Sequence, residues 1–383
     1  MKKERKIAFH FILLLGIVSL FADITYEGAR SVIGPYLAIL GASASVVGII
    51  SGIGEFLGYS LRLPFGYLAD YTKKYWLITF LGYGLILSVP LLAFANRWEI
   101  AAFLIILERI GKVRGPARDA ILSYATKKVG RGFGFGIHEA LDQLGALIGP
   151  LIFSILFFLN WSYREAFTIL WIPAFLTLFV LGFARTKIPS PQKFEKRKVK
   201  RKTKLPKAFW YYSLFIFLSV AGFVNFQIIS YHFKTLKLIS DVQIPLFYSI
   251  AMAVDAVVAL LVGKIYDRIG FSLLILIPFL TILIPFFTFS FIPLLLLVGI
   301  ILWGATMGIH ETIMRAAIAD LTPINRRGFA YGIFNTLYGI SWLFGSSLIG
   351  LMYEISMGYI GTFVIGMEIL SVIVFILIKK SLH

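Results

Sequence analysis

The sequence contains no cysteine, so neither a disulfide nor a thiolate metal site can be part of the protein. Only 15% of its 383 residues are charged, whereas a soluble protein carries roughly a quarter. By contrast, 59% are hydrophobic, which is more than a soluble core of this size could bury. The apolar runs are continuous rather than alternating, which excludes a β-barrel. The composition therefore predicts an all-α membrane protein that crosses the bilayer many times.

Twelve apolar segments each approach the roughly 20 residues that a spanning helix needs. Of the 37 lysines and arginines, 26 lie in segments assigned to the cytoplasm and four in external loops, so both termini are expected in the cytoplasm. The net charge of +18 is thus a signal of topology, and we expect no nucleic-acid partner. The predicted spans are 7–40, 44–69, 75–95, 98–126, 131–159, 163–185, 207–234, 244–268, 271–290, 293–321, 327–355 and 358–378.

Two motifs recur at nearly the same offset, which indicates a tandem duplication of a six-helix unit. Gly66-Tyr-Leu-Ala-Asp70 returns 197 residues later as Gly263-Lys-Ile-Tyr-Asp267, and Arg131-Gly-Phe-Gly-Phe-Gly-Ile137 returns 196 residues later as Arg327-Gly-Phe-Ala-Tyr-Gly-Ile333. The segment 186–206, rich in lysine and proline, lies between the two copies. We predict an N-terminal bundle at 1–185, a basic cytoplasmic linker at 186–206 and a C-terminal bundle at 207–383, with a binding site between the halves.

These motifs resemble those of the major facilitator superfamily, and the resemblance covers nearly the whole chain. The loop signature between helices two and three is matched by Gly66, Asp70 and Lys74, and again by Gly263, Asp267 and Arg268. Gly145-Ala-Leu-Ile-Gly149-Pro150 is similar to the helix-five signature of the superfamily's antiporters, and the chain resembles prokaryotic drug/proton-antiporter-like exporters. The resemblance implies twelve helices in two pseudo-symmetric bundles, with these motifs controlling closure. The alternative to a role in closure is that the aspartates only cap their own loops and that the glycines only allow ordinary helix packing.

Charged side chains within the predicted spans are the sharpest functional signal. A lipid-exposed ion at mid-bilayer costs at least about 2.5 kcal/mol, so such groups face a partner or an aqueous path. Asp23, Glu27 and Arg30 share one helical stripe. Our candidates for proton coupling are Asp23, Glu27, Arg30, Glu139 and Asp142. A wider charge network, which could be purely structural, comprises Glu55, Arg62, Glu108, Arg109, Lys112, Arg114, Arg118, Asp119, His138, Asp255, Glu311 and Arg315; the second half also carries His310 and Glu368.

Neutral polar groups near mid-depth are candidate substrate contacts. The histidines lack paired ligand spacing, so we expect no metal, and the absence of a phosphate-binding loop predicts no cofactor and transport driven by a gradient. The candidate substrate contacts are Tyr26, Tyr59, Gln143, Asn225, Gln227, Asn335 and Tyr338.

The sequence predicts a monomeric secondary transporter in the plasma membrane of a prokaryote. Its partners would be a small-molecule substrate, protons and membrane lipids. The first hypothesis is proton-coupled efflux of a small amphipathic compound. The second is proton-coupled uptake of an organic anion bound by Arg30, Arg109, Lys112 and Arg114. A remote third is a membrane-embedded enzyme acting on a lipid-linked substrate.

Overall fold

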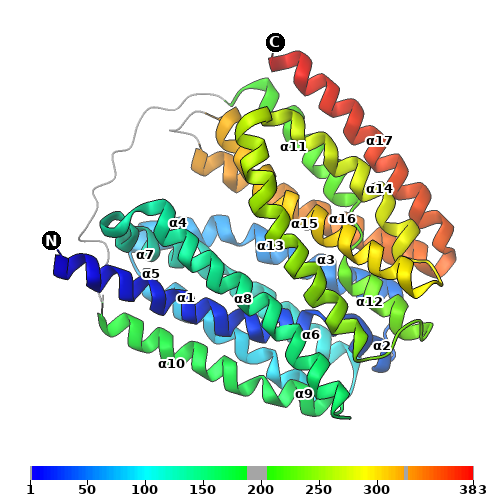
Figure 1. Cartoon of the computed structure of the whole chain (residues 1–383), viewed down its shortest axis with the longest axis horizontal. Coiled ribbons are helices and arrows are strands. Elements are labelled where there is room, and N and C mark those ends of the chain that lie inside the picture. Colours follow the sequence, from blue (N-terminus) through cyan, green and yellow to red (C-terminus); the bar gives the residue numbers. More distant parts are fainter. Residues whose placement is uncertain (1, 188–204, 323–326, 383) are drawn as a thin grey trace. The chain divides into compact units, whose positions relative to one another are not determined.

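The computed structural model describes residues 2–187, 205–322 and 327–382, and within them it omits the side chains of residues 2–4, 127, 128, 131, 132, 315, 328, 381 and 382. All regular secondary structure in these ranges is helical (Figure 1), which confirms the predicted all-α class. The helices are α1 (Lys2–Arg30), α2 (Ile33–Ile39), α3 (Ala44–Ser60), α4 (Arg62–Thr72), α5 (Tyr75–Gly84), η1 (Leu85–Ser88), η2 (Pro90–Phe94), α6 (Trp98–Ile110), η3 (Gly111–Val113), α7 (Arg114–Val129), α8 (Arg131–Phe158), α9 (Tyr163–Ile169), α10 (Trp171–Lys187), α11 (Lys207–Ala221), α12 (Phe226–Thr235), α13 (Gln243–Ile269), η5 (Gly270–Ile275), α14 (Leu276–Thr288), α15 (Pro293–Leu321), α16 (Arg327–Ile355) and α17 (Met357–Leu382).

Each predicted span coincides with one helix or with consecutive helices. The first span, for example, is α1 followed by α2, and the seventh is α11 followed by α12. In the described part of the chain, nine helical stretches are long and apolar enough to cross a membrane, and one of them, Gln243–Thr288, is 46 residues long and covers two predicted spans. The chain is therefore a multi-pass membrane protein.

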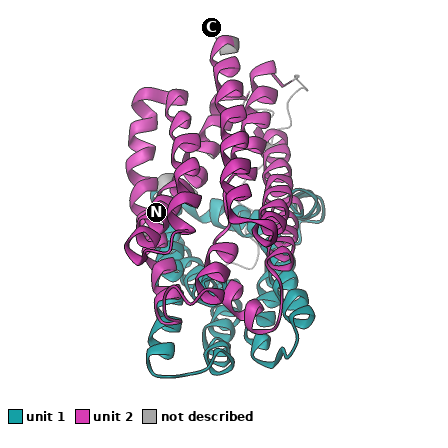
Figure 2. Ribbon diagram, turned by 90° about the vertical axis from the view of Figure 1, so that its right-hand side faces the viewer, with its two compact units in different colours: residues 1–31, 61–198 teal, residues 32–60, 199–383 magenta. Residues whose placement is uncertain are grey.

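The chain forms two compact units, coloured separately in Figure 2. Unit 1 comprises residues 1–31 and 61–198, and unit 2 comprises residues 32–60 and 199–383. Residues 32–60 pack with unit 2 because α3 lies along α16. The predicted linker at 186–206 falls almost entirely outside the described residues, and the predicted division into bundles at 1–185 and 207–383 stays a prediction.

Unit 1 is organised around α1, which packs most extensively against α8 and also contacts α10 and α7 (Figure 1). The sharp reversal between α7 and α8 depends on Gly130, whose φ of +107° is accessible to glycine and strained for other residues. α9 begins with a capping box, in which Ser162 and Glu165 satisfy the first backbone amides of that helix. Gly130 and the capping box thus define where α8 and α9 begin.

Unit 2 is built from the pairs α3 with α16, α13 with α15, and α11 with α17. Small residues permit the first pair: a Cβ on Gly48 would lie 2.3 Å from the carbonyl oxygen of Ser346. Glu354, near the end of α16, accepts a hydrogen bond of 2.8 Å from the backbone amide of Ser45 and so caps the start of α3. The seventh span is interrupted between α11 and α12, where Asn225 caps the second helix.

Candidate substrate and ion site

The acidic stripe of α1 is buried against α8 within unit 1. Asp23, Glu27 and Arg30 expose only 4%, 5% and 6% of their surface. Glu27 accepts a hydrogen bond from Arg30 at 3.3 Å, and the carboxyl group of Asp23 meets that of Asp142 within hydrogen-bonding range. Two carboxyl groups can share a hydrogen bond only when one of them carries a proton. The Asp23–Asp142 pair is therefore suited to hold a proton inside the membrane.

Glycines of the helix-five motif bring α8 onto the same stretch of α1. A Cβ on Gly145 would lie 2.5 Å from the carbonyl oxygen of Leu20 and 2.9 Å from Cβ of Asp23. A Cβ on Gly149 would lie 2.6 Å from the carbonyl oxygen of Ile24 and 2.7 Å from the amide of Gly28. Pro150 follows within α8 and is buried. The motif thus sets the approach of the helix that carries Asp142 to the helix that carries Asp23.

A cluster of cations surrounds the ring of Tyr26, one turn from Asp23. The centroid of this ring lies 5.9 Å from Cζ of Arg109, 5.6 Å from Nζ of Lys112 and 5.8 Å from Cζ of Arg114. Cations at such distances are attracted to the electron-rich face of an aromatic ring. Glu108 offsets part of this charge, since its Oε2 lies 3.3 Å from Nε of Arg109. The cluster can attract an anionic group.

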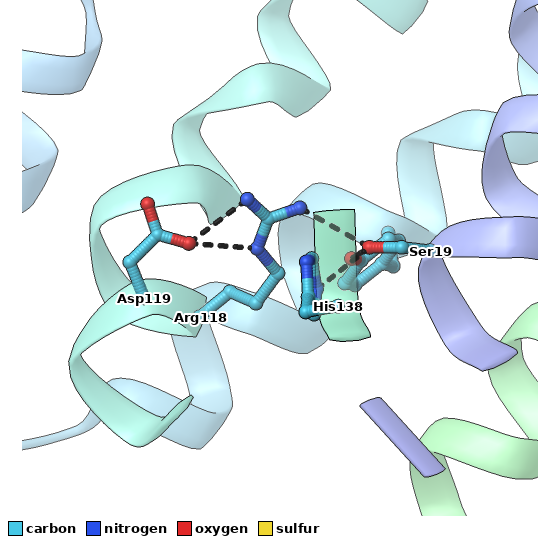
Figure 3. Close-up of polar contacts among 5 residues, drawn as sticks. Ser19, Arg118, Asp119 and His138 are labelled. Atoms are coloured by element: carbon cyan, nitrogen blue, oxygen red, sulfur yellow. Dashed lines mark hydrogen bonds and ion pairs between the residues drawn. The ribbon is translucent and has the colours of Figure 1, made fainter. Parts of the chain in front are cut away.

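A chain of hydrogen bonds centres on Ser19, which lies one turn before Asp23 in α1 (Figure 3). Ser19 Oγ lies 3.0 Å from Nε2 of His138 and accepts a hydrogen bond of 3.2 Å from Nη1 of Arg118. Arg118 also donates from Nε to Oδ1 of Asp119 at 2.9 Å. Ser19 is absent from the predicted set although it stands four residues before Asp23 on the same helical stripe, which is the signal that could have identified it. Tyr83, whose hydroxyl lies 3.4 Å from Ser19 Oγ, carries no such signal.

Replacement of Ser19 by alanine is expected to destabilise the protein by about 1–3 kcal/mol, because it removes the partner of Nε2 of buried His138 and one of the hydrogen bonds of half-buried Arg118. Thermal unfolding of the purified protein measures the effect. Ser123→Ala is the matched control, since the Ser123 hydroxyl donates only to the carbonyl of Ala120 in its own helix, at 2.8 Å. Equal unfolding temperatures for the two variants would contradict the importance of this chain of contacts.

The remaining predicted residues of unit 1 lie apart from the acid pair or at its edge. Glu139 is exposed on α8, and Gln143 is half-buried. Arg62 is half-buried on α4. In the first copy of the repeated loop motif, Asp70 accepts a hydrogen bond of 2.9 Å from the hydroxyl of Tyr75, while Gly66 lies on α4 and Lys74 is exposed just before α5.

The predicted residues of unit 2 are spread over five helices. Tyr59 and Tyr338 are in ring contact, with centroids 4.7 Å apart, and Asn225 accepts from the amide of Ile228 to cap α12. Glu55, Gln227 and Asp255 are buried, whereas Glu311 and Asn335 are half-buried. Asp267 and Arg268 are exposed at the end of α13, near Gly263. The side chain of Arg315 lies outside the described residues. In the second copy of the motif, Tyr266 rather than Asp267 is held, by a 2.7 Å hydrogen bond to Asp320.

An aromatic cluster in unit 2 was not predicted from the sequence. Phe223 contacts the rings of Trp303, His310 and Trp342 at centroid distances of 5.5, 5.0 and 5.7 Å. Neither ring nitrogen of His310 has a hydrogen-bond partner within the described part of the chain. The abundance of phenylalanine, with 36 residues, made this cluster impossible to recognise in the sequence, because no spacing distinguishes it from ordinary helix packing.

Comparison with known proteins identifies the class to which this fold belongs. A family model for the Major Facilitator Superfamily matches residues 15–346 and, in a second match, 239–381, and the chain belongs to this superfamily. An uncharacterised protein of Mycobacterium tuberculosis is 39% identical over 382 residues, with 97% of this chain and 93% of the relative covered. An uncharacterised transporter of the same superfamily from Methanocaldococcus jannaschii is 28% identical over 364 residues, covering 90% and 89% of the two chains.

Solved structures show the same fold at low sequence identity. The nucleoside transporter NupG is 15% identical with a TM-score of 0.72, and the alignment covers 97% of this chain and 99% of that chain. A bacterial homologue of the human lysosomal transporter Spinster, in an inward-facing and unoccupied conformation, is 14% identical with a TM-score of 0.71, covering 100% and 96%. The predicted family and its twelve-helix fold are confirmed. The protein is a secondary transporter that works by alternating access, and the hypothesis of an enzyme is wrong.

Proposed function

We propose that this transporter couples efflux of a small amphipathic compound to proton entry, as a monomer in the plasma membrane of a prokaryote with both termini in the cytoplasm. The observation that carries the proposal is the proximity of the carboxyl group of buried Asp23 to that of half-buried Asp142, a pair that can share one proton. The helix-five glycine motif beside this pair favours the direction of export. The basic segments assigned to the cytoplasm support the orientation.

Exchange follows from the charge of the acid pair. On the outside, where protons are supplied, one carboxyl group takes up the proton and the pair carries a single negative charge. On the inside, loss of this proton leaves two adjacent carboxylates, which repel each other and attract a cationic or amphipathic substrate. Proton and substrate then compete for the same pair of oxygens, and each favours a different state of the carrier. Arg114, whose charge acts on Asp23, limits the repulsion.

A second candidate is proton-coupled uptake of an organic anion. It is favoured by the three cations around Tyr26, which would bind a carboxylate or phosphate with the ring as an apolar platform. The nucleoside transporter among the structural relatives adds nucleosides to the compounds that should be tested.

The test uses purified protein in proteoliposomes that contain a pH-sensitive dye. Ethidium, benzoate and uridine represent a lipophilic cation, an organic anion and a nucleoside. Under the export proposal, an imposed proton gradient drives ethidium across the membrane in the direction opposite to proton movement. Dissipating the gradient should stop this transport. Transport of benzoate in the same direction as protons would favour the uptake proposal over the export proposal. Transport of any probe without proton movement would refute proton coupling.

A further inference from the structure

The seventh span is broken inside unit 2, and the break leaves backbone carbonyls without donors. α11 ends at Ala221 and α12 begins at Phe226. Val224 O accepts from Nε1 of Trp303 at 2.8 Å, but no backbone amide of the described residues donates to the carbonyls of Gly222 or Phe223. Non-helical backbone at membrane depth is tolerated only where protein or a water-filled cavity satisfies it. Such breaks are where membrane transporters of other folds coordinate cations.

A buried carboxylate from the last helix faces this break. Glu368, on α17, is 0% exposed. Its Oε2 accepts a hydrogen bond of 2.9 Å from Ser371, whereas its Oε1 has no hydrogen-bond partner within the described part of the chain. Oε1 lies 2.7 Å from the position that a Cβ on Gly222 would occupy, so a larger residue there would displace this oxygen from the end of α11. The carboxylate is therefore aimed at the end of α11 without a donor to meet it.

Oxygen atoms of α11 and of the break lie on the side of Glu368 that faces Gly222, together with one buried donor without a partner in the described residues, Nδ2 of Asn225. Ser219, three residues before Gly222 and thus on the same face of α11, has a fully buried hydroxyl with no hydrogen-bond partner among the described residues. The carbonyl of Ser219, like those of Gly222 and Phe223, receives no backbone hydrogen bond in that part of the chain. A carboxylate oxygen without a partner, together with hydroxyl and carbonyl oxygens, offers ligands for a hard cation, and buried polar atoms left without partners call for a ligand or water.

We propose that Glu368 and the break between α11 and α12 form a binding site for a sodium ion. One carboxylate balances one positive charge, whereas calcium and magnesium sites usually combine several charged or water ligands, which favours a monovalent ion. Glu368 supplies the charged ligand, and Ser219 with the carbonyls of the break supplies neutral ones. This site lies on α11 and α17, uses none of the residues of the Asp23–Asp142 pair, and goes beyond the proposed proton-coupled export.

Binding of radioactive sodium to the purified full-length protein tests the proposal directly. The wild type is expected to bind sodium saturably, and replacement of choline by sodium at constant ionic strength is expected to raise its unfolding temperature. Glu368→Gln is expected to abolish both effects. Asp255→Asn is the matched control, because Asp255 is another buried acid of unit 2, on α13, with 3% exposure, and it should bind sodium as the wild type does.

A second variant keeps the carboxylate and blocks its approach to the break. Gly222→Ala places a Cβ 2.7 Å from Oε1 of Glu368 and is expected to weaken sodium binding about 10- to 100-fold. This variant carries the test if Glu368→Gln fails to fold. Sodium binding that survives in Glu368→Gln, or unfolding temperatures that are equal in sodium and choline, would overturn the proposal. Asp23→Asn should leave sodium binding intact, which separates this site from the proton pair.

Discussion

Asp23→Asn is expected to reduce proton-driven transport at least about 100-fold, a loss equivalent to ~2.7 kcal/mol. The amide cannot release a proton, so the pair with Asp142 stays in the equivalent of its protonated state at every pH. Exchange of substrate for substrate does not require proton release and should persist. The measurement compares accumulation driven by a pH gradient with counterflow in the same proteoliposomes, using the probe that the wild type transports.

Glu99→Gln is the matched control for this experiment. Glu99 lies in the first turn of α6, its side chain is 48% exposed, and its neighbour in an ion pair is Arg97 at 3.6 Å, so the substitution removes a carboxylate away from the acid pair. Its proton-driven accumulation should equal that of the wild type. Asp142→Asn should reproduce the defect of Asp23→Asn. Full proton-driven accumulation in Asp23→Asn would exclude this pair as the coupling site.

Gly149→Ala is expected to destabilise the protein by about 1–3 kcal/mol or more, because added atoms in a close-packed contact force the backbone to shift. The new Cβ would lie 2.6 Å from the carbonyl oxygen of Ile24 and 2.7 Å from the amide nitrogen of Gly28. Both are backbone atoms of α1 and cannot move aside as a flexible side chain would. Thermal unfolding should show a decrease in Tm of about 1–4 °C, the shift that 1–3 kcal/mol produces in a chain of 383 residues.

Gly136→Ala provides the comparison on the same helix. A Cβ at Gly136 would meet no atom within 4 Å, so alanine should be tolerated there and should favour the helix by about 0.5–1 kcal/mol. A Tm for Gly149→Ala as high as that of Gly136→Ala would show that α1 and α8 are not in close contact at this point. Because Asp23 lies in the same contact, transport by Gly149→Ala should also fall, and the unfolding measurement separates that loss from simple misfolding.

The helical class, the twelve spans and the family could be predicted from the sequence because they rest on local signals. Hydropathy over about 20 residues locates spans, and the spacing of Asp23, Glu27 and Arg30 places them on one stripe. The partner of Asp23 could not be predicted, since Asp142 is far away in sequence and the contact depends on the register between α1 and α8. For the same reason, Glu139 was grouped with Asp142 yet is exposed, because a small rotation of α8 decides which of them faces α1.

The groups that sequence analysis underrated are those that depend on breaks in helices. A continuous seventh span was predicted, and the interruption at residues 222–225 was not, because the apolar run through Phe223 and Val224 carries no proline. Without that break, Glu368 is simply a charge in the last span with no evident partner. Tertiary contacts such as that of Trp303 with Val224 stabilise the break, and no local pattern announces them.

The backbone contact between α1 and α8 has a mechanical consequence. Gly145 and Gly149 contact main-chain atoms of α1 at two successive turns of α8. If one helix slid along the other, backbone atoms of the two helices would clash. Repulsion between Asp23 and Asp142, when both are ionised, therefore cannot be relieved by a shift along the helix axes. Water or substrate must enter between them instead. Any movement that exposes these two aspartates to the other side of the membrane would therefore move α1 and α8 together as one rigid body.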